Sequence, residues 1–391
     1  MIKRLFAAAS VCALLASPAV AADVKIGFVT TLTTPAAVIG NDMRDAANLA
    51  MEHIGHSMGG KKAEIIYGDD GFKPQIGKQQ TEKLLQKDGV DIVTGFIWSH
   101  VLLASAKEVL DAGKILISAN AGPSQLAGNK CHKNFFNVSW QNDQTPMAMG
   151  EYLNQAGVKS LYVIAPNYAA GKNMVAGVER SFKGEIVGKD MTKWPAQKDW
   201  AAELTKVKAA NPDGVFIFYP GGHGPAFMKQ YAQAGLDGKI PLYSVFTIDA
   251  IALPRLQKAN MTTALGAPHT QMWSPDLDNA QNKKFVDGFK AKYGRYPSFY
   301  AAQAYDAIHM IKAGVDAVNG DTSNVDGMRA EMAKATFPTV RGSIKFGNNH
   351  YPIQNFYLRE AVKDADGNWT TVVKATVLKD HQDPYAKDCK M

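Results

Sequence analysis

The stretch Val24-Lys25-Ile26-Gly27-Phe28-Val29 begins the pattern that decides the fold, because a short apolar run of this kind is typical of a buried strand. Residues 41–54 follow with apolar side chains at helical spacing on one face. Residues 63–67 form a second apolar run that ends at Asp69-Asp70. A strand, a helix and a strand in this order predict a βαβ unit with parallel strands.

The same alternation continues along the chain. We predict further helices at 74–87, 104–112, 145–156, 171–182, 200–210 and 226–234, and further strands at 90–95, 115–119, 160–165, 185–190, 214–219 and 241–244. After residue 265 the sequence predicts a helix pair, 283–293 and 299–319, and strand-like segments at 354–358 and 370–377. Since the pattern restarts near residue 145, we predict an α/β fold with two successive units of similar size.

Length and composition agree with two globular domains. The chain has 391 residues, of which 46% are hydrophobic and 20% charged. This balance excludes a disordered or fibrous protein. The formal net charge is +7, but no run of four Lys or Arg residues occurs. Nucleic-acid binding is therefore disfavoured, because it usually needs a clustered basic patch.

The first residues are typical of a secretory signal peptide. Lys3 and Arg4 precede an apolar stretch, residues 5–15, and Ala19-Val20-Ala21 forms a cleavage signal. The apolar stretch is too short for a membrane span, which needs about 20 residues. We expect cleavage after Ala21 and a soluble protein exported to the periplasm.

The cysteines indicate a disulfide. Cys12 lies within the signal peptide, where a lipid attachment is an alternative, although the residues before it do not follow the usual pattern. Removal of Cys12 leaves Cys131 and Cys389, and two cysteines in an exported chain usually pair. A bond between them would pin residues 379–391 onto the body of the protein; two free thiols are the alternative.

No motif indicates an enzyme or a metal site. The serine-hydrolase elbow, the Walker loop and the zinc-protease motif are absent from the sequence. Gly221-Gly222-His223-Gly224 follows a predicted strand but lacks the other features of a dinucleotide site. Asp69 and Asp70 point in opposite directions along a strand, so turn roles are expected for them. His53 and His56 have no further ligand at metal-binding spacing.

Ligands of open parallel sheets bind at the carboxyl ends of the strands. Six segments of this sequence follow predicted strands, and a site is sought there: residues 30–34, 96–100, 120–123, 166–168, 220–223 and 246–249.

Several motifs, in this order and spacing, resemble one family. They are Val24-Lys25-Ile26-Gly27, Tyr67-Gly68-Asp69-Asp70, Gly95 to Ser99, Ile117-Ser118-Ala119-Asn120-Ala121-Gly122, Lys292-Tyr293-Gly294 with Pro297, and Tyr305-Asp306-Ala307. They resemble the periplasmic solute-binding proteins of ABC importers, and more narrowly the leucine/isoleucine/valine-binding type. The resemblance covers the whole mature chain.

The resemblance implies a type I periplasmic binding protein, with two Rossmann-like lobes joined by a three-stranded hinge. Lobe 1 would comprise residues 22–141 and 272–353, and lobe 2 residues 142–271 and 354–391. The chain would cross near residues 141, 271 and 353. The lobes would close over one small ligand, and the closed form would dock on a membrane permease. A monomer without cofactor or catalytic residue is expected.

The resemblance also implies where a ligand carboxylate would bind. The matching positions are Ser99 and the backbone N–H groups of Asn120, Ala121 and Gly122. A helix beginning near His100 adds the positive end of its dipole.

The expected partners of an amino group are missing. Relatives that bind amino acids offer an Asp after the first crossing and a Glu in the second lobe, whereas this chain has Asn142 there and Phe246 or Thr247. Where those relatives place a Tyr, this chain has Pro220 or Gly221. Asp249 or Asp143 could supply a shifted partner for an ammonium group.

Aromatic side chains surround the same expected cleft: Trp98, Tyr168, Tyr219, Phe246 and Phe299. With the acids missing, they favour a benzoate-, hydroxybenzoate- or phenylpropenoid-like acid, with His100, His223 or Asp249 binding a ring hydroxyl. The alternatives are a branched-chain amino acid, or a ligand-sensing role beside a membrane receptor.

Overall fold

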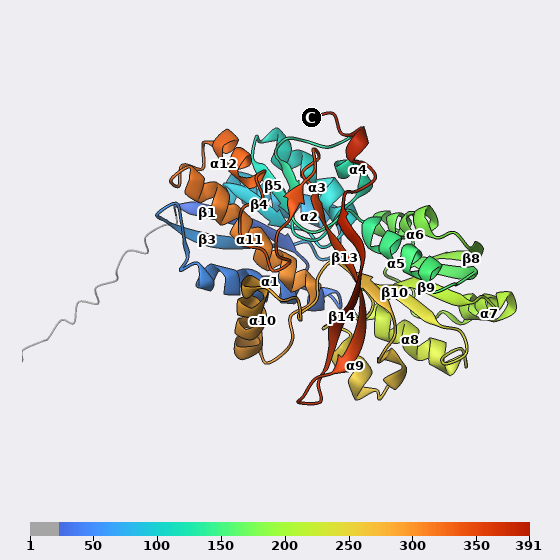
Figure 1. Ribbon diagram of the computed structural model, residues 1–391. Coiled ribbons are helices and arrows are strands. Elements are labelled where there is room, and N and C mark those ends of the chain that lie inside the picture. Colours follow the sequence, from blue (N-terminus) through green and yellow to red (C-terminus); the bar gives the residue numbers. More distant parts are fainter. Residues whose placement is uncertain (1–22) are drawn as a thin grey trace, which may run out of the picture.

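The computed structural model describes residues 23–391, and it has two α/β lobes side by side (Figure 1). The predicted signal peptide, residues 1–21, and Cys12 within it lie outside the described residues. In the part described, no helix has both the length and the apolar character needed to cross a membrane.

The first lobe is built on a six-stranded sheet in the order β2-β3-β1-β4-β5-β6, parallel except for β2. Its strands are β1 (Val24–Thr30), β2 (Ser57–Met58), β3 (Lys61–Asp69), β4 (Ile92–Gly95), β5 (Ile115–Ser118) and β6 (Phe135–Asn137). Its helices are α1 (Ala37–His53), α2 (Pro74–Lys83), α3 (Ser99–Asp111), α4 (Ser124–Ala127), α10 (Ala280–Tyr293), α11 (Phe299–Ala317) and α12 (Val325–Met332).

The second lobe is built on a mixed sheet in the order β12-β13-β11-β10-β9-β7-β8, with β14 paired to β13. Its strands are β7 (Ser160–Pro166), β8 (Glu185–Thr192), β9 (Gly214–Phe218), β10 (Leu242–Val245), β11 (His269–Gln271), β12 (Lys345–Phe346), β13 (Pro352–Lys363) and β14 (Trp369–His381). Its helices are α5 (Gln144–Gln155), α6 (Ala169–Ser181), α7 (Ala201–Ala210), α8 (His223–Gln233) and α9 (Leu253–Lys258).

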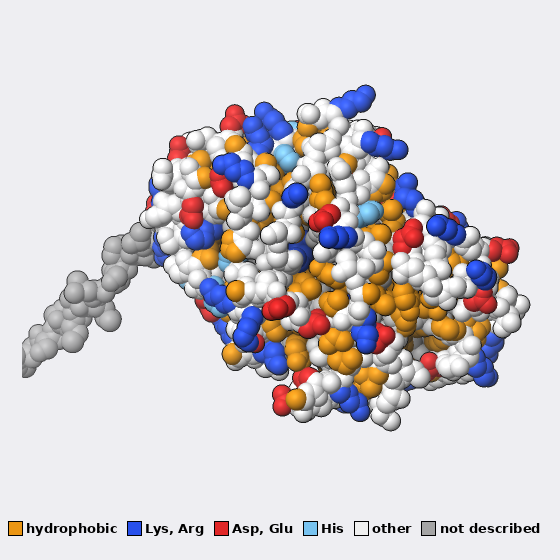
Figure 2. Space-filling model, in the orientation of Figure 1, with side chains coloured by type: hydrophobic (Ala, Val, Ile, Leu, Met, Phe, Trp, Pro, Cys, Tyr) orange, Lys and Arg blue, Asp and Glu red, His pale blue; other side chains and the backbone are white. Residues whose placement is uncertain are grey.

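The central strands are continuous apolar runs because helices cover both faces of each sheet. Every residue of β4, β5 and β9 is buried. On the face shown in Figure 2, basic and acidic side chains are interspersed. The predicted two-lobed α/β fold is therefore confirmed.

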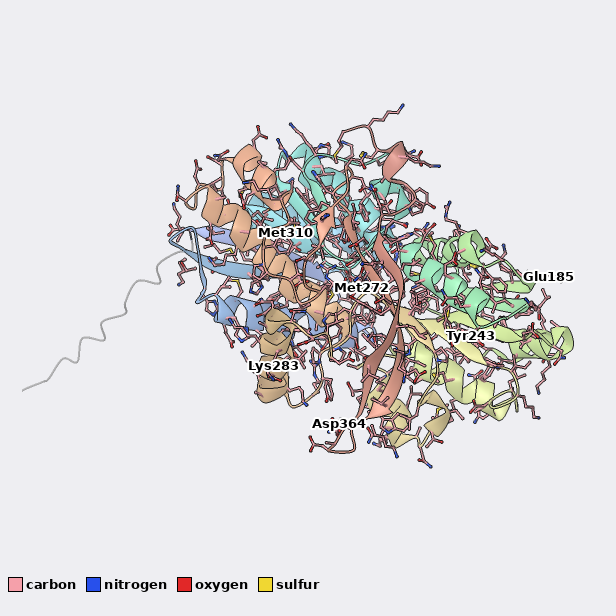
Figure 3. All side chains as sticks on the ribbon, in the orientation of Figure 1. Glu185, Tyr243, Met272, Lys283, Met310 and Asp364 are labelled. Carbon is pink, nitrogen blue, oxygen red and sulfur yellow. A yellow bond between two sulfur atoms is a disulfide. The ribbon has the colours of Figure 1, made fainter. Side chains whose placement is uncertain are left out.

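The chain passes between the lobes three times. It leaves the first sheet after β6, returns after β11 to α10, which contacts α1, and passes again to β13. Met272, directly after β11, lies at the junction, whereas Met310 lies in the first lobe and Glu185 at the far end of the second (Figure 3). The exact lobe limits given above stay a prediction.

A buried arginine ties these crossings together. The Nε of the Arg341 guanidinium donates a hydrogen bond to Asp306 Oδ2 of α11, and the two atoms are 3.1 Å apart. It also donates to the Val138 carbonyl at 2.6 Å and to Gln354 Oε1 of β13 at 2.6 Å. Burial raises the pKa of Asp306 to about 6, while the nearby Arg341 charge acts in the opposite direction. One side chain thus links the first crossing, helix α11 and the third crossing.

The predicted disulfide between Cys131 and Cys389 is present. It attaches the C-terminal tail to the first lobe. The same tail contacts the second lobe, because Tyr385 donates to Asp143 Oδ2 at 3.0 Å. The tail therefore spans both lobes beside the crossings.

The structure differs from the sequence prediction at several short elements. The helix predicted over 74–87 ends as α2 at Lys83 and continues as a π-helical turn, Leu84–Asp88. The three-residue strands β6 and β11 and the helix α12 were not predicted, since such short segments carry little periodicity. The segments predicted at 354–358 and 370–377 are parts of the longer β13–β14 hairpin.

We expect the change Arg341→Met to lower the free energy of unfolding by about 3–5 kcal/mol, because it leaves the Asp306 carboxylate buried without its partner. Urea unfolding followed by circular dichroism measures this. The matched control is Lys107→Met, which removes an exposed helix-surface ion pair with Asp111 and should leave stability near that of the wild type. A loss at Arg341 no larger than at Lys107 would contradict the assigned role.

Candidate functional site

A narrow cavity lies between the lobes, at the carboxyl ends of the strands, and the space between its lining side chains is about 300 Å³ with open solvent included. The lining residues come from loops of both lobes, from helices α3, α6 and α11 and from the end of β9: Ile97, Trp98, Ser99, Asn120, Ala121, Trp140, Asn142, Tyr168, Ala170, Met174, Phe218, Pro220, Phe246 and Tyr300.

Trp98 forms one wall of the cavity and is held by a hydrogen-bond chain. Its indole Nε1 donates to Thr31 Oγ1 at 2.8 Å, and that hydroxyl donates to Asp70 Oδ1 at 2.5 Å. Asp70 also accepts the Phe72 backbone N–H, while Asp69 accepts those of Leu32 and Gly71. The turn roles predicted for the two acids are confirmed, and Asp70 acts through Thr31 to position Trp98.

The polar end of the cavity lies at the start of α3. Asn142 Nδ2 donates to Ser99 Oγ at 3.0 Å, and Asn142 Oδ1 accepts the Gly122 N–H at 3.1 Å. Of the expected backbone donors, that of Ala121 is also used, since it bonds the Phe96 carbonyl. Within residues 23–391, the N–H groups at the first two positions of α3, Ser99 and His100, have no protein acceptor. A helix start with free N–H groups and a hydroxyl is suited to an anion.

Further polar atoms face the cavity without a protein partner. Asn120 Nδ2 bonds the Ile97 carbonyl, so its Oδ1 is left as a buried free acceptor. Trp140 Nε1 is a buried free donor. The hydroxyls of Tyr168 and Tyr300 form no hydrogen bond within the described part of the chain, and burial raises both pKa values, so both phenols stay protonated. These atoms can bind a polar ligand.

The remaining walls are aromatic rings from both lobes. The Tyr168 ring is 6.3 Å from Phe218 and 6.5 Å from Trp98, measured between centroids. The Phe246 ring is 4.7 Å from Trp140. Such walls favour a flat, apolar ligand body.

Phe246 reaches the cavity from a left-handed backbone conformation, with φ of 55°. This conformation costs a non-glycine residue about 1–3 kcal/mol. Thr247 braces the turn, because its hydroxyl donates to the Val245 carbonyl at 3.1 Å and accepts the Tyr219 N–H at 3.0 Å.

No Asp, Glu, Lys, Arg or His occurs among the described residues that line the cavity. A ligand carboxylate would meet helix N–H groups and hydroxyls there, whereas a ligand ammonium would meet no carboxylate.

Six residues expected at the ligand do not line this cavity: His100, Gly122, Tyr219, Gly221, Thr247 and Asp249. Tyr219 points into the second-lobe core, where its hydroxyl bonds Thr192 and Trp200, because neighbouring strand residues face opposite sides. Thr247 braces its turn, as described above. Asp249 Oδ1 accepts the N–H groups of Ile251 and Ala252 and lies in a separate pocket.

Other expected residues lie nearby with different contacts. His100, His223 and Gly221 line a larger groove outside the cavity. Asp143 is buried against Gln141, Arg180 and Tyr385, so its carboxylate is already partnered. Phe299 packs against Phe246 at 5.2 Å, behind the cavity wall.

Some residues that line the cavity were not predicted from the sequence, among them Trp140, Met174, Phe218 and Tyr300. Phe218 is the last residue of β9 and Tyr300 the second of α11, so each lies one position from a residue that was named. Adjacent side chains at the end of β9 point to opposite sides, so Phe218 faces the cavity and Tyr219 faces away from it.

Comparisons with known proteins agree with the two-lobed fold. A family described as periplasmic binding protein matches residues 23–368. Among solved structures, an R. palustris solute-binding protein of an ABC transporter, in complex with benzoate, has 31% identity and a TM-score of 0.86, covering 94% of this chain and 99% of that one. A solute-binding protein from Rhodopseudomonas palustris BisB5, in complex with 3,4-dihydroxybenzoic acid, has 27% identity and a TM-score of 0.83, covering 91% and 98%. Among curated proteins, Leu/Ile/Val-binding protein homolog 6 of Brucella abortus is 26% identical, covering 94% of this chain and 95% of the relative.

The buried Asp249 predicts a pH effect on stability. Burial raises its pKa to about 7 from an ordinary 3.8. Between these values the folded chain binds more protons than the unfolded chain, so the contribution of Asp249 to the free energy of unfolding falls as the pH rises toward 7. Above about pH 7 the carboxyl is ionised in both states, and the contribution no longer changes with pH. We expect wild type to lose on the order of 3 kcal/mol relative to Asp249→Asn between about pH 5 and about pH 8. Urea unfolding at several pH values measures the difference, and parallel curves would contradict it.

Proposed function

The chain belongs to the periplasmic binding protein family and is a solute-binding protein of an ABC transporter; we propose that its ligand is a small aromatic carboxylate without an amino group. The observation that carries this proposal is the absence of any charged side chain among the described residues lining the cavity. A buried ammonium group without a carboxylate would cost several kcal/mol. The cavity therefore disfavours an α-amino acid.

The ligand carboxylate would bind at the start of α3. The free N–H groups of Ser99 and His100 and the Ser99 hydroxyl provide donors, and the helix dipole adds a favourable potential. The bond from Asn142 to Ser99 Oγ leaves the hydroxyl proton free to point at an anion.

The ring would lie between the aromatic side chains of the two lobes. Tyr168, Phe218 and Phe246 come from the second lobe. Trp98 and Trp140 come from the first lobe, where they follow β4 and β6. A flat ring contacts both sets at once, so ligand binding favours the closed arrangement. The relatives in complex with benzoate and 3,4-dihydroxybenzoic acid support this ligand class.

Closure would then present the protein to a permease in the inner membrane. A binding protein of this kind acts by population shift, because the permease distinguishes the closed form from the open one. Export to the periplasm and a monomeric state belong to the same proposal.

Thermal melting with a ligand panel tests the ligand class. The mature protein is first unfolded and refolded to remove carried ligand. We expect benzoate and 4-hydroxybenzoate to raise the melting temperature, since ligand at 100 times Kd adds about 2.7 kcal/mol. Leucine, valine and phenylalanine should not raise it. A shift with leucine alone would overturn the proposal in favour of amino-acid binding.

The change Asn142→Asp tests the carboxylate position. It keeps the shape of the side chain but adds a negative charge beside Ser99, so we expect affinity for benzoate to fall at least about tenfold. Titration calorimetry measures the affinity. The control Asn324→Asp makes the same charge change at the exposed start of α12, where the oxygen still accepts the Gly327 N–H. Equal affinities for the two variants would place the carboxylate elsewhere.

A further inference from the structure

A second hollow, here called the outer groove, adjoins the cavity on its solvent side. It encloses about 1,990 Å³ including its open mouth. Trp98 and Pro220 line both the cavity and the outer groove, so the two share a wall. Phe72 and Trp98 come from the first lobe, and Trp194 from the second. The outer groove therefore forms only where the lobes meet.

The charge of the outer groove is one-sided. Among the described residues lining it are Lys73, Lys198 and Arg255, and none is Asp or Glu. None of the three cations forms an ion pair within residues 23–391, whereas basic and acidic side chains are interspersed on the face in Figure 2. The Arg255 guanidinium lies against Gly222 at the groove wall. The groove thus carries an uncompensated positive charge.

The boundary between the groove and the cavity is aromatic and carries unpaired ring nitrogens. The Trp194 ring is 5.9 Å from Trp98 and stacks on Tyr168 at 5.5 Å. Trp194 Nε1 and His100 Nδ1 are buried and have no hydrogen-bond partner among the described residues. Burial lowers the pKa of His100 to about 4, so its ring is neutral at ordinary pH. A polar group crossing this boundary would meet one free donor and one free acceptor.

From these observations we infer that the protein selects an elongated aromatic acid with a second anionic group at its far end. This inference rests on the proposed function. The first carboxylate and its ring occupy the cavity, and the remainder passes Trp98 and Trp194 into the outer groove. There the second anion lies near Lys198 and Arg255 of the second lobe and Lys73 of the first. A single-ring monoacid would leave this charged groove without a partner.

The matched ligands are cinnamate and 4-carboxycinnamate, which share a ring and spacer and differ by the second carboxylate. We expect 4-carboxycinnamate to bind three- to tenfold more tightly at about 20 mM salt, because the cations are exposed and act through solvent. The advantage should shrink at about 300 mM salt. Titration calorimetry on the refolded wild-type protein measures both affinities.

The double variant Lys198→Gln/Arg255→Gln separates the outer groove from the cavity. It should reduce the advantage of the dianion to less than about twofold while leaving the cinnamate affinity unchanged. The control Lys208→Gln removes an exposed cation of α7 outside the groove and should change neither affinity. The inference is overturned if the dianion binds no more tightly than cinnamate, or if the double variant weakens both acids equally. Failure of every aromatic acid to bind would instead overturn the proposed function.

Discussion

The buried ion pair between Arg341 and Asp306 is the constraint on which the relation of the two lobes depends. Its guanidinium also bonds the Val138 and Ser139 carbonyls and Gln354, so one charge organises the first and third crossings and helix α11. Burial of a guanidinium costs free energy, and hydrogen bonds to its donors offset that cost. The need for these hydrogen bonds fixes where the segments after β6 and before β13 run. Trp140 and Asn142, which follow the first of these segments, are thereby placed at the cavity.

The site combines a helix start with aromatic walls, and none of the described residues lining it is charged. Its binding energy therefore depends on shape, ring contact and a few hydrogen bonds. Several of the polar groups are held in place by hydrogen bonds within the protein. Asn142 accepts the Gly122 N–H, Asn120 donates to the Ile97 carbonyl, and Trp98 donates to Thr31. Preorganised groups of this kind lose little entropy on binding. Of these two hollows, the outer groove is the one with cations among its described lining residues, and solvent there weakens their effect and makes it sensitive to salt.

Much of the fold and part of the site could be predicted from the sequence. The long apolar strands and amphipathic helices repeat clearly, and the loops after the strands contain Trp98, Ser99, Asn120, Ala121, Asn142, Tyr168 and Phe246, which do line the cavity. The expected residues that do not line the cavity lie where one residue of shift matters. Tyr219 faces the second-lobe core and Phe218 the cavity, because adjacent residues at a strand end point to opposite sides. Asp249 was expected near the ligand, but its carboxylate accepts local backbone N–H groups.

By itself, the sequence determined the alternation of strands and helices, the two-unit organisation and the pairing available to Cys131 and Cys389, because hydrophobic periodicity and residue identity are local properties. Only the tertiary structure decided which side chains share the cavity. Tyr300 enters it from α11, far along the chain. The Asp143 carboxylate is partnered by Gln141, Arg180 and Tyr385, and Asp249, whose Oδ2 has no partner among the described residues, lies in a separate pocket. The outer groove also exists only through contact between the lobes. These features depend on side-chain direction and on long-range packing, which a local sequence pattern does not contain.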